Sequence, residues 1–145
     1  MKRASAASRL RLEGLIDAAS AARARAYAPY SRYAVGAALE TGSGKVFAGC
    51  NVENASYGAC LCAERSAVAQ MVAAGESNPV ACAVVTGGAS PGAPCGICRQ
   101  VLSEFAKDLL VVLVAEGPRG RIRRETTLAS LLPLAFHLES RSRRK

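Results

Sequence analysis

Two short stretches, Cys62-Ala63-Glu64 and Pro94-Cys95-Gly96-Ile97-Cys98, determine how the rest of this chain is interpreted. Together they supply three thiols and one carboxylate. A catalytic zinc site requires three protein ligands, an open fourth position for water and an acid/base beside it. We therefore interpret the remaining sequence as the scaffold and the substrate pocket of one such site.

Both stretches lie where a helix is expected to begin. Segment 61–74 contains no Gly or Pro and is rich in Ala, and segment 95–105 follows a Gly/Pro-rich loop, so we expect a helix over each. A helix N-terminus carries partial positive charge and free N–H groups, which favour a thiolate over a thiol. The expected placement therefore suits metal binding.

The six cysteines admit other interpretations. A Cys-x-x-Cys pair alone can be a redox couple, and a single Cys can be a small buried apolar side chain. Cys60 is the nearest fourth thiol for a closed structural site, but its spacing to Cys62 is unusual for one. Cys50 and Cys82 fall in apolar strands and are expected in the core, and His137, near the C-terminus, is not expected as a ligand. The ligands expected for one zinc ion per chain are Cys62, Cys95 and Cys98.

Composition indicates one globular domain with basic ends. The chain has 145 residues, of which 50% are hydrophobic, and its formal net charge is +8. Much of this charge lies in tails over about 1–9 and 138–145, which we expect to be flexible parts of a single domain over 1–145. Basic and aromatic residues are not interleaved, so we expect solvated tails rather than a nucleic-acid-binding face.

Whether the cysteines form disulfides or remain reduced depends on the cellular compartment. They would form disulfides in a secreted protein, but no apolar segment typical of a signal peptide follows the basic start. A transit peptide is a weak alternative, because Glu13 and Asp17 soon interrupt the Arg- and Ser-containing start. No apolar run reaches the ~20 residues of a membrane span. We expect a reduced cytoplasmic protein without a membrane partner, in which cysteines bind metal.

Residue periodicity predicts the remaining elements. In chain order these are an amphipathic helix over 8–27, strands over 33–40 and 45–54 joined by a tight turn, strands over 80–86, 109–115 and 121–125, and a helical turn over 128–132. The run 109–115 is apolar throughout, which suits a strand buried on both faces. A hairpin followed by alternating helices and strands predicts an α/β fold, a three-layer α/β/α sandwich with a mixed five-stranded sheet.

A polar pair lies on the second of these strands. Asn51 and Glu53 are two residues apart, so both side chains should leave one face while Val52 packs on the other. An amide beside a carboxylate can bind a sugar hydroxyl, which both donates and accepts. From the residues alone, a solvated strand end is an equal alternative.

Longer stretches resemble one family. Cys-x-Glu followed by Pro-Cys-x-x-Cys is the all-cysteine form of a zinc deaminase signature. Segments 30–39, 49–58, 62–65, 94–100 and 131–136 resemble the small free-nucleoside cytidine deaminases. The zinc segments mark only the superfamily, whereas Asn51-Val52-Glu53-Asn54-Ala55-Ser56-Tyr57-Gly58 is more specific.

The resemblance implies a chemistry and its residues. Zinc-dependent hydrolysis would convert cytidine and deoxycytidine into uridine and deoxyuridine with release of ammonia, as in pyrimidine salvage. Glu64 would carry protons, and Asn51 and Glu53 would hold the ribose 3′-OH. Arg65 directly follows Glu64 and can hydrogen-bond the ligand sulfurs, although an ordinary surface arginine is the alternative.

The resemblance also implies a homotetramer whose pockets are completed by neighbouring subunits. Ala55 and Tyr57 would approach the ribose 5′ side of a neighbour's substrate, and Phe136 would stack on the pyrimidine. Tyr33 stands where the family usually has Phe packed on the base. Its extra hydroxyl needs a partner or solvent, which leaves the fine substrate preference open.

Three alternatives to a free-nucleoside enzyme remain. One is deamination of another cytosine compound such as blasticidin S, and another is editing of a polynucleotide. The third is a non-catalytic zinc module that binds RNA through its basic tails. The Asn51 and Glu53 pair favours a ribose, and a pocket capped by neighbours favours a small molecule.

Overall fold

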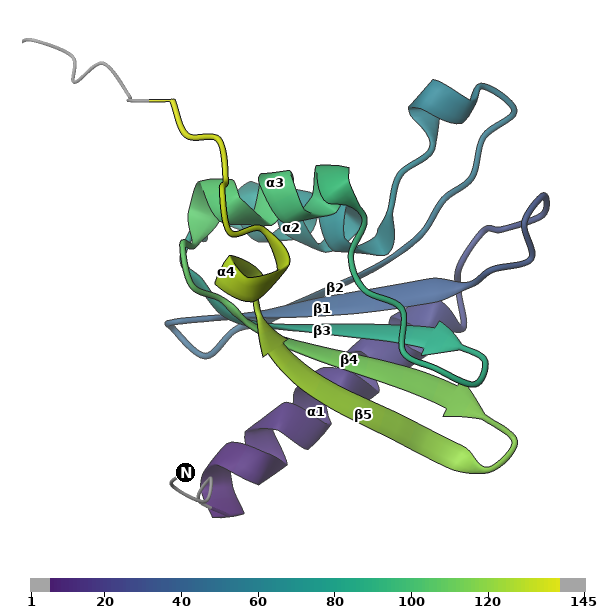
Figure 1. Ribbon diagram of the computed structural model, residues 1–145, viewed down its shortest axis with the longest axis horizontal. Helices are drawn as coiled ribbons and strands as arrows, with labels where there is room; N and C mark the ends of the chain where they lie inside the picture. The colour runs from purple at the N-terminus through teal and green to yellow at the C-terminus, as the bar shows by residue number, and fades with distance from the viewer. Residues whose placement is uncertain (1–5, 139–145) are drawn as a thin grey trace, which may run out of the picture.

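One mixed five-stranded sheet organises the computed structural model, which describes residues 6–138. The elements are α1 (Ala6–Arg23), β1 (Val35–Thr41), β2 (Val46–Cys50), the 3-10 turn η1 (Tyr57–Ala59), α2 (Ala63–Ala73), β3 (Pro79–Gly87), α3 (Gly96–Phe105), β4 (Leu110–Gly117), β5 (Gly120–Thr127) and α4 (Leu128–Leu131). The strand order is β2-β1-β3-β4-β5 (Figure 1). Strand β1 runs antiparallel to β2 and β3, β3 is parallel to β4, and β4 is antiparallel to β5.

Helices cover both faces of this sheet. Helix α1 lies across one face, and α2, α3 and α4 lie on the other (Figure 1). The residues of α1 that are buried against the sheet lie at the spacing of one helix face: Leu12, Leu15, Ile16 and Ala19. On β4, Val112 and Val114 face α1, while Val111 and Leu113 face the other helices. The predicted α/β/α sandwich, with a strand buried on both faces, is confirmed.

Helix α1 packs unusually close to β1. A Cβ built on Gly36 would lie 1.9 Å from the carbonyl oxygen of Ala19. Only glycine permits this approach, because any side chain would collide with the helix backbone. The last turn of α1 is thereby held against the end of the sheet at which β1 begins.

Two expected boundaries are wrong. Helix α1 ends at Arg23 instead of 27, because the chain turns there and Tyr27 N–H donates to the Asn51 carbonyl oxygen. Strand β2 ends at Cys50 instead of 54, so the polar pair lies in an irregular segment beyond the strand. Val52 in that segment forms isolated bridges and is 42% exposed, so it does not pack in the core as expected.

Of the two cysteines expected in the core, one is buried there and the other is not. Cys82 is fully buried, whereas Cys50, at the end of β2, is only half-buried and its thiol contacts the Arg25 carbonyl oxygen. The expected flexible tails fall mostly on residues 1–5 and 139–145, which lie outside the described residues. Residues 6–9 are helical, as the start of α1, and the flexibility expected for them stays a prediction.

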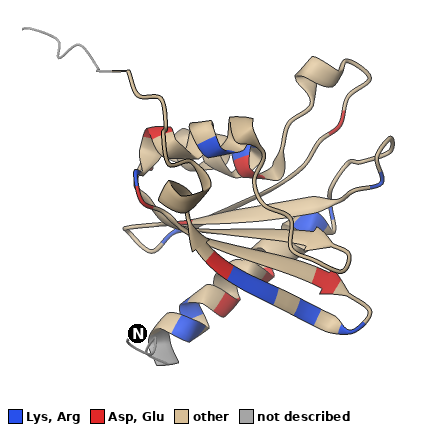
Figure 2. Cartoon of the chain, in the orientation of Figure 1, with Lys and Arg blue, Asp and Glu red and all other residues tan. Residues whose placement is uncertain are grey.

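Several basic residues are paired within the fold. Figure 2 shows basic positions along β5 close to acidic positions on α1. Arg121 pairs with Asp17 at 2.8 Å, and Arg123 pairs with Glu13 at 2.8 Å. Part of the positive charge therefore joins β5 to α1. Among residues 6–138, the structure contains no helix with the length and apolar character needed to cross a bilayer.

Candidate metal and substrate site

The N-termini of α2 and α3 bring three thiols together. Cys62 is the residue that caps α2, Cys95 caps α3, and Cys98 lies in the first turn of α3. Their sulfur atoms all lie within 4.8 Å of one another, and the sulfurs of Cys62 and Cys95 are 3.9 Å apart. Two segments far apart in sequence thus form one cluster of soft ligands.

This cluster fits a zinc ion. A tetrahedral zinc with bonds of about 2.3 Å separates its thiolate sulfurs by about 3.8 Å, close to the observed spacing. Thiolate ligands also suit zinc better than magnesium or calcium, which prefer oxygen. Among the described residues, one group of three or more His, Cys, Asp or Glu side chains lies close enough together to hold a metal ion. It consists of Cys62, Cys95 and Cys98, and the exposed His137 is not part of it.

The three thiols differ in their tendency to ionise. Burial acts to raise the pKa of Cys95, but the N–H groups of Cys98 and Ile97 and the neighbouring thiols outweigh it, so the pKa is lowered. Burial raises the pKa of Cys62 and of Cys98. A bound divalent cation would reverse the preference of Cys62 and Cys98 for the protonated form, because a thiol gives up its proton when it coordinates a metal ion.

Glu64 is the buried carboxylate of the site. It is 5% exposed, and its Oε2 accepts a hydrogen bond from the Cys98 thiol at 3.6 Å. Burial raises the pKa of this carboxyl. A raised pKa makes a carboxylate a stronger base, and a group that both takes up and releases a proton is what acid/base catalysis needs.

Arg65 contacts the ligand cluster rather than solvent alone. Its Nη2 donates to the Cys62 sulfur at 3.7 Å and to the Cys60 carbonyl oxygen at 2.9 Å. Its Nε is buried and has no partner among the described residues. The Cys60 sulfur instead contacts the backbone of Asn54, and it is not part of the metal-binding group.

A cavity of about 250 Å³ opens beside the thiols. Its wall is formed by Cys62, Cys95 and Glu64 together with the segment before β1, the end of β3 and the loop before α3. The lining residues are Ser31, Tyr33, Val35, Asn51, Glu53, Cys62, Ala63, Glu64, Val84, Thr86, Ala93 and Cys95. Two of the three clustered thiols, Cys62 and Cys95, therefore line the same cavity as the polar pair expected from the sequence.

Asn51 and Glu53 also organise the segment that precedes β1. The Asn51 side chain accepts from Val35 N–H and donates to the Tyr33 carbonyl oxygen, both at 2.8 Å. Glu53 accepts from the N–H groups of Tyr30 and Ser31 at 2.9 and 3.2 Å, and from the Ser31 hydroxyl. The Ser31 hydroxyl is the main cause of a lowered pKa at Glu53. Both residues thus line the cavity while their side chains hold segment 30–35 in place.

Sequence reasoning missed several lining residues. Ser31 and Thr86 line the cavity, and Thr86 Oγ1 accepts from Gly92 N–H at 3.2 Å, which ties the loop before α3 to β3. No local pattern marked Ser31, because its exposed backbone N–H can bond to water as well as to Glu53. No local pattern marked Thr86, because it resembles any other residue at the end of a strand.

Three expected substrate residues lie outside this cavity. Ala55 and Tyr57 are exposed, and Tyr57 lines a separate hollow with Tyr30 and Cys60. Phe136 is 66% exposed, and its carbonyl oxygen accepts from the Gln100 side chain. Within one chain these three residues do not reach the thiols or Glu64.

Comparison with known proteins gives a consistent result. A family model described as the cytidine and deoxycytidylate deaminase zinc-binding region matches residues 11–114. The cytidine deaminase of Sporosarcina psychrophila is 44% identical over 131 residues, covering 90% of this chain and 95% of that protein.

Solved structures extend this similarity. The crystal structure of cytidine deaminase from Burkholderia pseudomallei is 54% identical with a TM-score of 0.79, covering 86% of this chain and 98% of that one. The enzyme from Mycobacterium tuberculosis is 44% identical with a TM-score of 0.75, covering 88% of this chain and 98% of that one.

Proposed function

The chain belongs to the family of cytidine and deoxycytidylate deaminases, and from this membership we propose that it deaminates free cytidine and deoxycytidine. The reaction is hydrolysis of a cyclic amidine C–N bond. It consumes one water and gives uridine or deoxyuridine and ammonia, a step of pyrimidine salvage. The enzyme depends on one zinc ion per chain, held by Cys62, Cys95 and Cys98.

The observation that carries this proposal is the position of Glu64. This carboxyl is buried at the cavity wall between two helix N-termini, and it touches one of the three clustered thiols. A structural zinc site has no need for a buried carboxyl in an open cavity. A deaminase requires one, because the proton lost by water must be transferred to the substrate.

When bound, the zinc ion supplies Lewis-acid activation of a water molecule. Glu64 takes one proton from the attacking water and delivers it to N3 of the pyrimidine ring while the oxygen adds to C4. The same carboxylate then takes the remaining proton from the oxygen on C4 and transfers it to the exocyclic amine, so that the C–N bond breaks, ammonia leaves and the carbonyl forms. The raised pKa of Glu64, caused by burial, suits both halves of this transfer.

The substrate contacts follow from the cavity wall. Asn51 and Glu53 hold the ribose 3′-OH, because together they offer an amide donor and a carboxylate acceptor at the same wall. Tyr33 packs its ring on the base. Arg65 hydrogen-bonds the Cys62 sulfur and places positive charge beside the negative ligand set, which offsets part of the charge donated by three thiolates.

The active form is a homotetramer with shared pockets. Tyr57 and Phe136 are 81% and 66% exposed, and aromatic side chains of this kind are enriched at protein interfaces. Ala55 and Tyr57 serve the ribose 5′ side of a neighbour's substrate, and Phe136 stacks on its base. The single domain operates in the cytoplasm, where the six free cysteines described in the structure remain reduced.

The test is the loss of ultraviolet absorbance when the purified protein is mixed with cytidine, with zinc per chain measured on the same sample. Conversion to uridine with about one zinc per chain is expected. A cytosine-containing oligonucleotide and blasticidin S are the comparison substrates. Turnover of either one without turnover of cytidine or deoxycytidine would overturn the proposal. Zinc without turnover of any of them would favour a binding module.

A further inference from the structure

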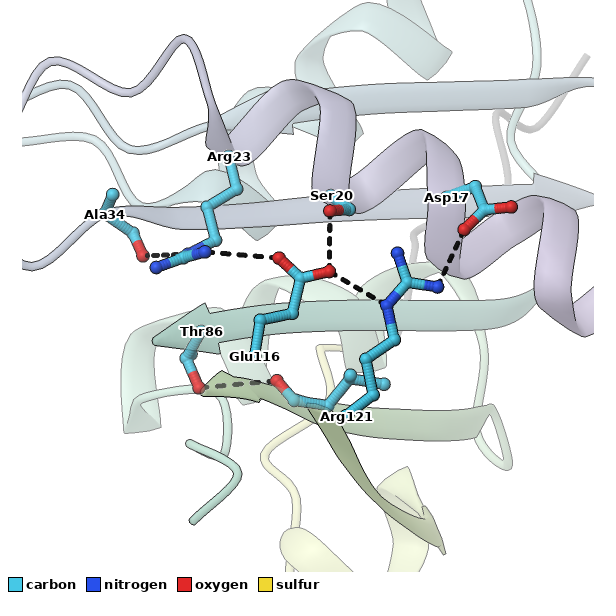
Figure 3. Close-up of polar contacts among 8 residues, drawn as sticks. Asp17, Ser20, Arg23, Ala34, Thr86, Glu116 and Arg121 are labelled. Atoms are coloured by element: carbon cyan, nitrogen blue, oxygen red, sulfur yellow. Dashed lines mark hydrogen bonds and ion pairs between the residues drawn. The ribbon is translucent and has the colours of Figure 1, made fainter. Parts of the chain in front are cut away.

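Arg23 joins three strand ends on the sheet face opposite the cavity. Its Nε donates to the Ala34 carbonyl oxygen at 3.0 Å, and its Nη1 pairs with Glu116 at 3.2 Å (Figure 3). Its Nη2 lies over Gly87, since a Cβ built there would be 2.5 Å away. One guanidinium therefore contacts the segment before β1 and the last residue of β3, while it binds the end of β4.

These contacts lie next to the walls of the substrate cavity. Ala34 lies between Tyr33 and Val35, which both line the cavity, and Gly87 follows Thr86, which lines it too. Neighbouring residues of a strand point to opposite faces. The backbone that Arg23 holds from the α1 side is thus the same backbone that presents cavity-lining side chains on the other side.

The guanidinium itself is held by an anchored carboxylate. Glu116 Oε1 also accepts from the Ser20 hydroxyl at 2.7 Å and from Arg121 Nε at 2.9 Å (Figure 3). The Arg23 and Glu116 side chains are 26% and 23% exposed, so water screens this pair only partly. Partial burial acts to raise the pKa of Glu116, but Ser20, Arg121 and Arg23 outweigh it, and the pKa is lowered.

We propose that Arg23 is a positioning residue for the nucleoside pocket, because its bond to the Ala34 carbonyl, beside the bonds of Asn51 to Tyr33 and Val35, helps to set the place of these two residues at the cavity wall. This inference rests on the proposed function. The planar fork of arginine holds a carbonyl oxygen and a carboxylate in different directions at once, which the single ammonium of lysine cannot do equally well. Arg23 touches neither Glu64 nor the thiols, so it acts on binding more than on proton transfer.

The alternative role for Arg23 is only to fasten α1 to the sheet. Arg121 provides a matched control, because it pairs with the same Glu116 and with Asp17 of α1 but bonds to neither Ala34 nor Gly87. Arg23→Met and Arg121→Met each remove one cation from the cluster and leave Glu116 two other donors. Both variants should lower Tm, and only the first should affect the pocket.

The experiment measures KM and kcat for cytidine, Kd for the product uridine, and Tm for each zinc-loaded protein. Arg23→Met is expected to raise KM and the uridine Kd about tenfold, the effect of one lost hydrogen bond on binding, with a much smaller change in kcat. Arg121→Met is expected to keep the wild-type KM and Kd. Arg23→Lys, which retains the charge, is expected to fall between wild type and Arg23→Met.

Equal KM and Kd values in wild type and Arg23→Met, at a lowered Tm, would overturn the inference. If Arg23→Met does not fold, Glu116→Gln takes its place, because it loosens Arg23 without removing it, and it must raise KM more than Arg121→Met does. Failure of the proposed function is separately visible in the wild-type protein, which would then neither convert cytidine nor bind uridine, and the inference would fail with it.

Discussion

The thiol of Cys98 donates a hydrogen bond to Oε2 of Glu64 across 3.6 Å. This contact joins the first turn of α3 to the first turn of α2. The candidate metal ligand Cys98 and the candidate acid/base Glu64 are therefore buried side by side. Because the carboxyl is reached from the cavity and is otherwise surrounded by protein, its environment raises its pKa. The arrangement gives separate tests for metal binding and for catalysis.

Glu64→Gln should fold, keep about one zinc per chain and lose about 10²- to 10⁴-fold in kcat, because the amide is nearly isosteric but cannot carry the proton. Steady-state kinetics and metal analysis on the same sample check this. Glu104→Gln, the same change at an exposed position of α3, should alter neither quantity. Full activity in Glu64→Gln would exclude it as the acid/base.

Cys98→Ala should lose both zinc and activity, since two thiols hold a zinc ion much more weakly than three. The matched control is Cys82→Ala, which removes a fully buried thiol that is not part of the metal-binding group and should retain zinc. Metal content after gel filtration decides the matter. A Cys98→Ala protein with a full complement of zinc would contradict the ligand assignment.

Ser31→Ala should raise KM for cytidine about three- to tenfold, with a small change in kcat. The Ser31 hydroxyl donates to Glu53 and accepts from Tyr33 N–H, so its loss releases both a polar residue and an aromatic residue of the cavity wall. Ser77→Ala, at an exposed serine between α2 and β3, is the control. An unchanged KM in Ser31→Ala would show that Glu53 does not depend on this contact.

Gly92→Ala should destabilise the protein by about 1 kcal/mol, the low end of the cost of overpacking, because the Tyr33 side chain is 48% exposed and its hydroxyl end can shift. A Cβ built on Gly92 would lie 2.7 Å from the Tyr33 hydroxyl and 3.0 Å from the Thr86 methyl. Tyr33→Phe removes the first of these clashes, so adding it to Gly92→Ala should recover part of the loss. Urea unfolding of the two single variants and the double variant measures this coupling, and strictly additive effects would disprove it.

Glu116→Gln should cost stability at neutral pH and progressively less in acid. The pKa of Glu116 is lowered in the folded protein, so its carboxylate contributes stability above the ordinary value of about 4.5. That contribution is lost as pH falls through the lower, folded pKa. Thermal unfolding at pH 7 and at successively lower pH should show the Tm difference from wild type shrinking below about pH 4.5. A constant difference would indicate a neutral packing effect.

Much of this protein was determined by the local sequence. The tight turn between β1 and β2, the apolar strand β4, and the helices expected over 61–74 and 95–105 were all predicted to within two residues, because each depends on residues close together in the chain. The cysteine spacing also predicted a zinc site, since ligand type and helix start are local properties. Boundaries failed where distant segments compete for the backbone, as at Tyr27, which bonds to Asn51 instead of extending α1.

Only the tertiary structure decided how these parts meet. The sequence could not show that the α2 and α3 N-termini bring their sulfurs to within 4.8 Å, or that Glu53 braces the Tyr30 and Ser31 backbone beside the cavity. Nor could it show that Arg23 reaches Ala34 and Glu116 across the far face of the sheet. Such contacts depend on the packing of a helix and three strands at once, and side-chain distances of a few ångströms follow from that packing rather than from any local pattern.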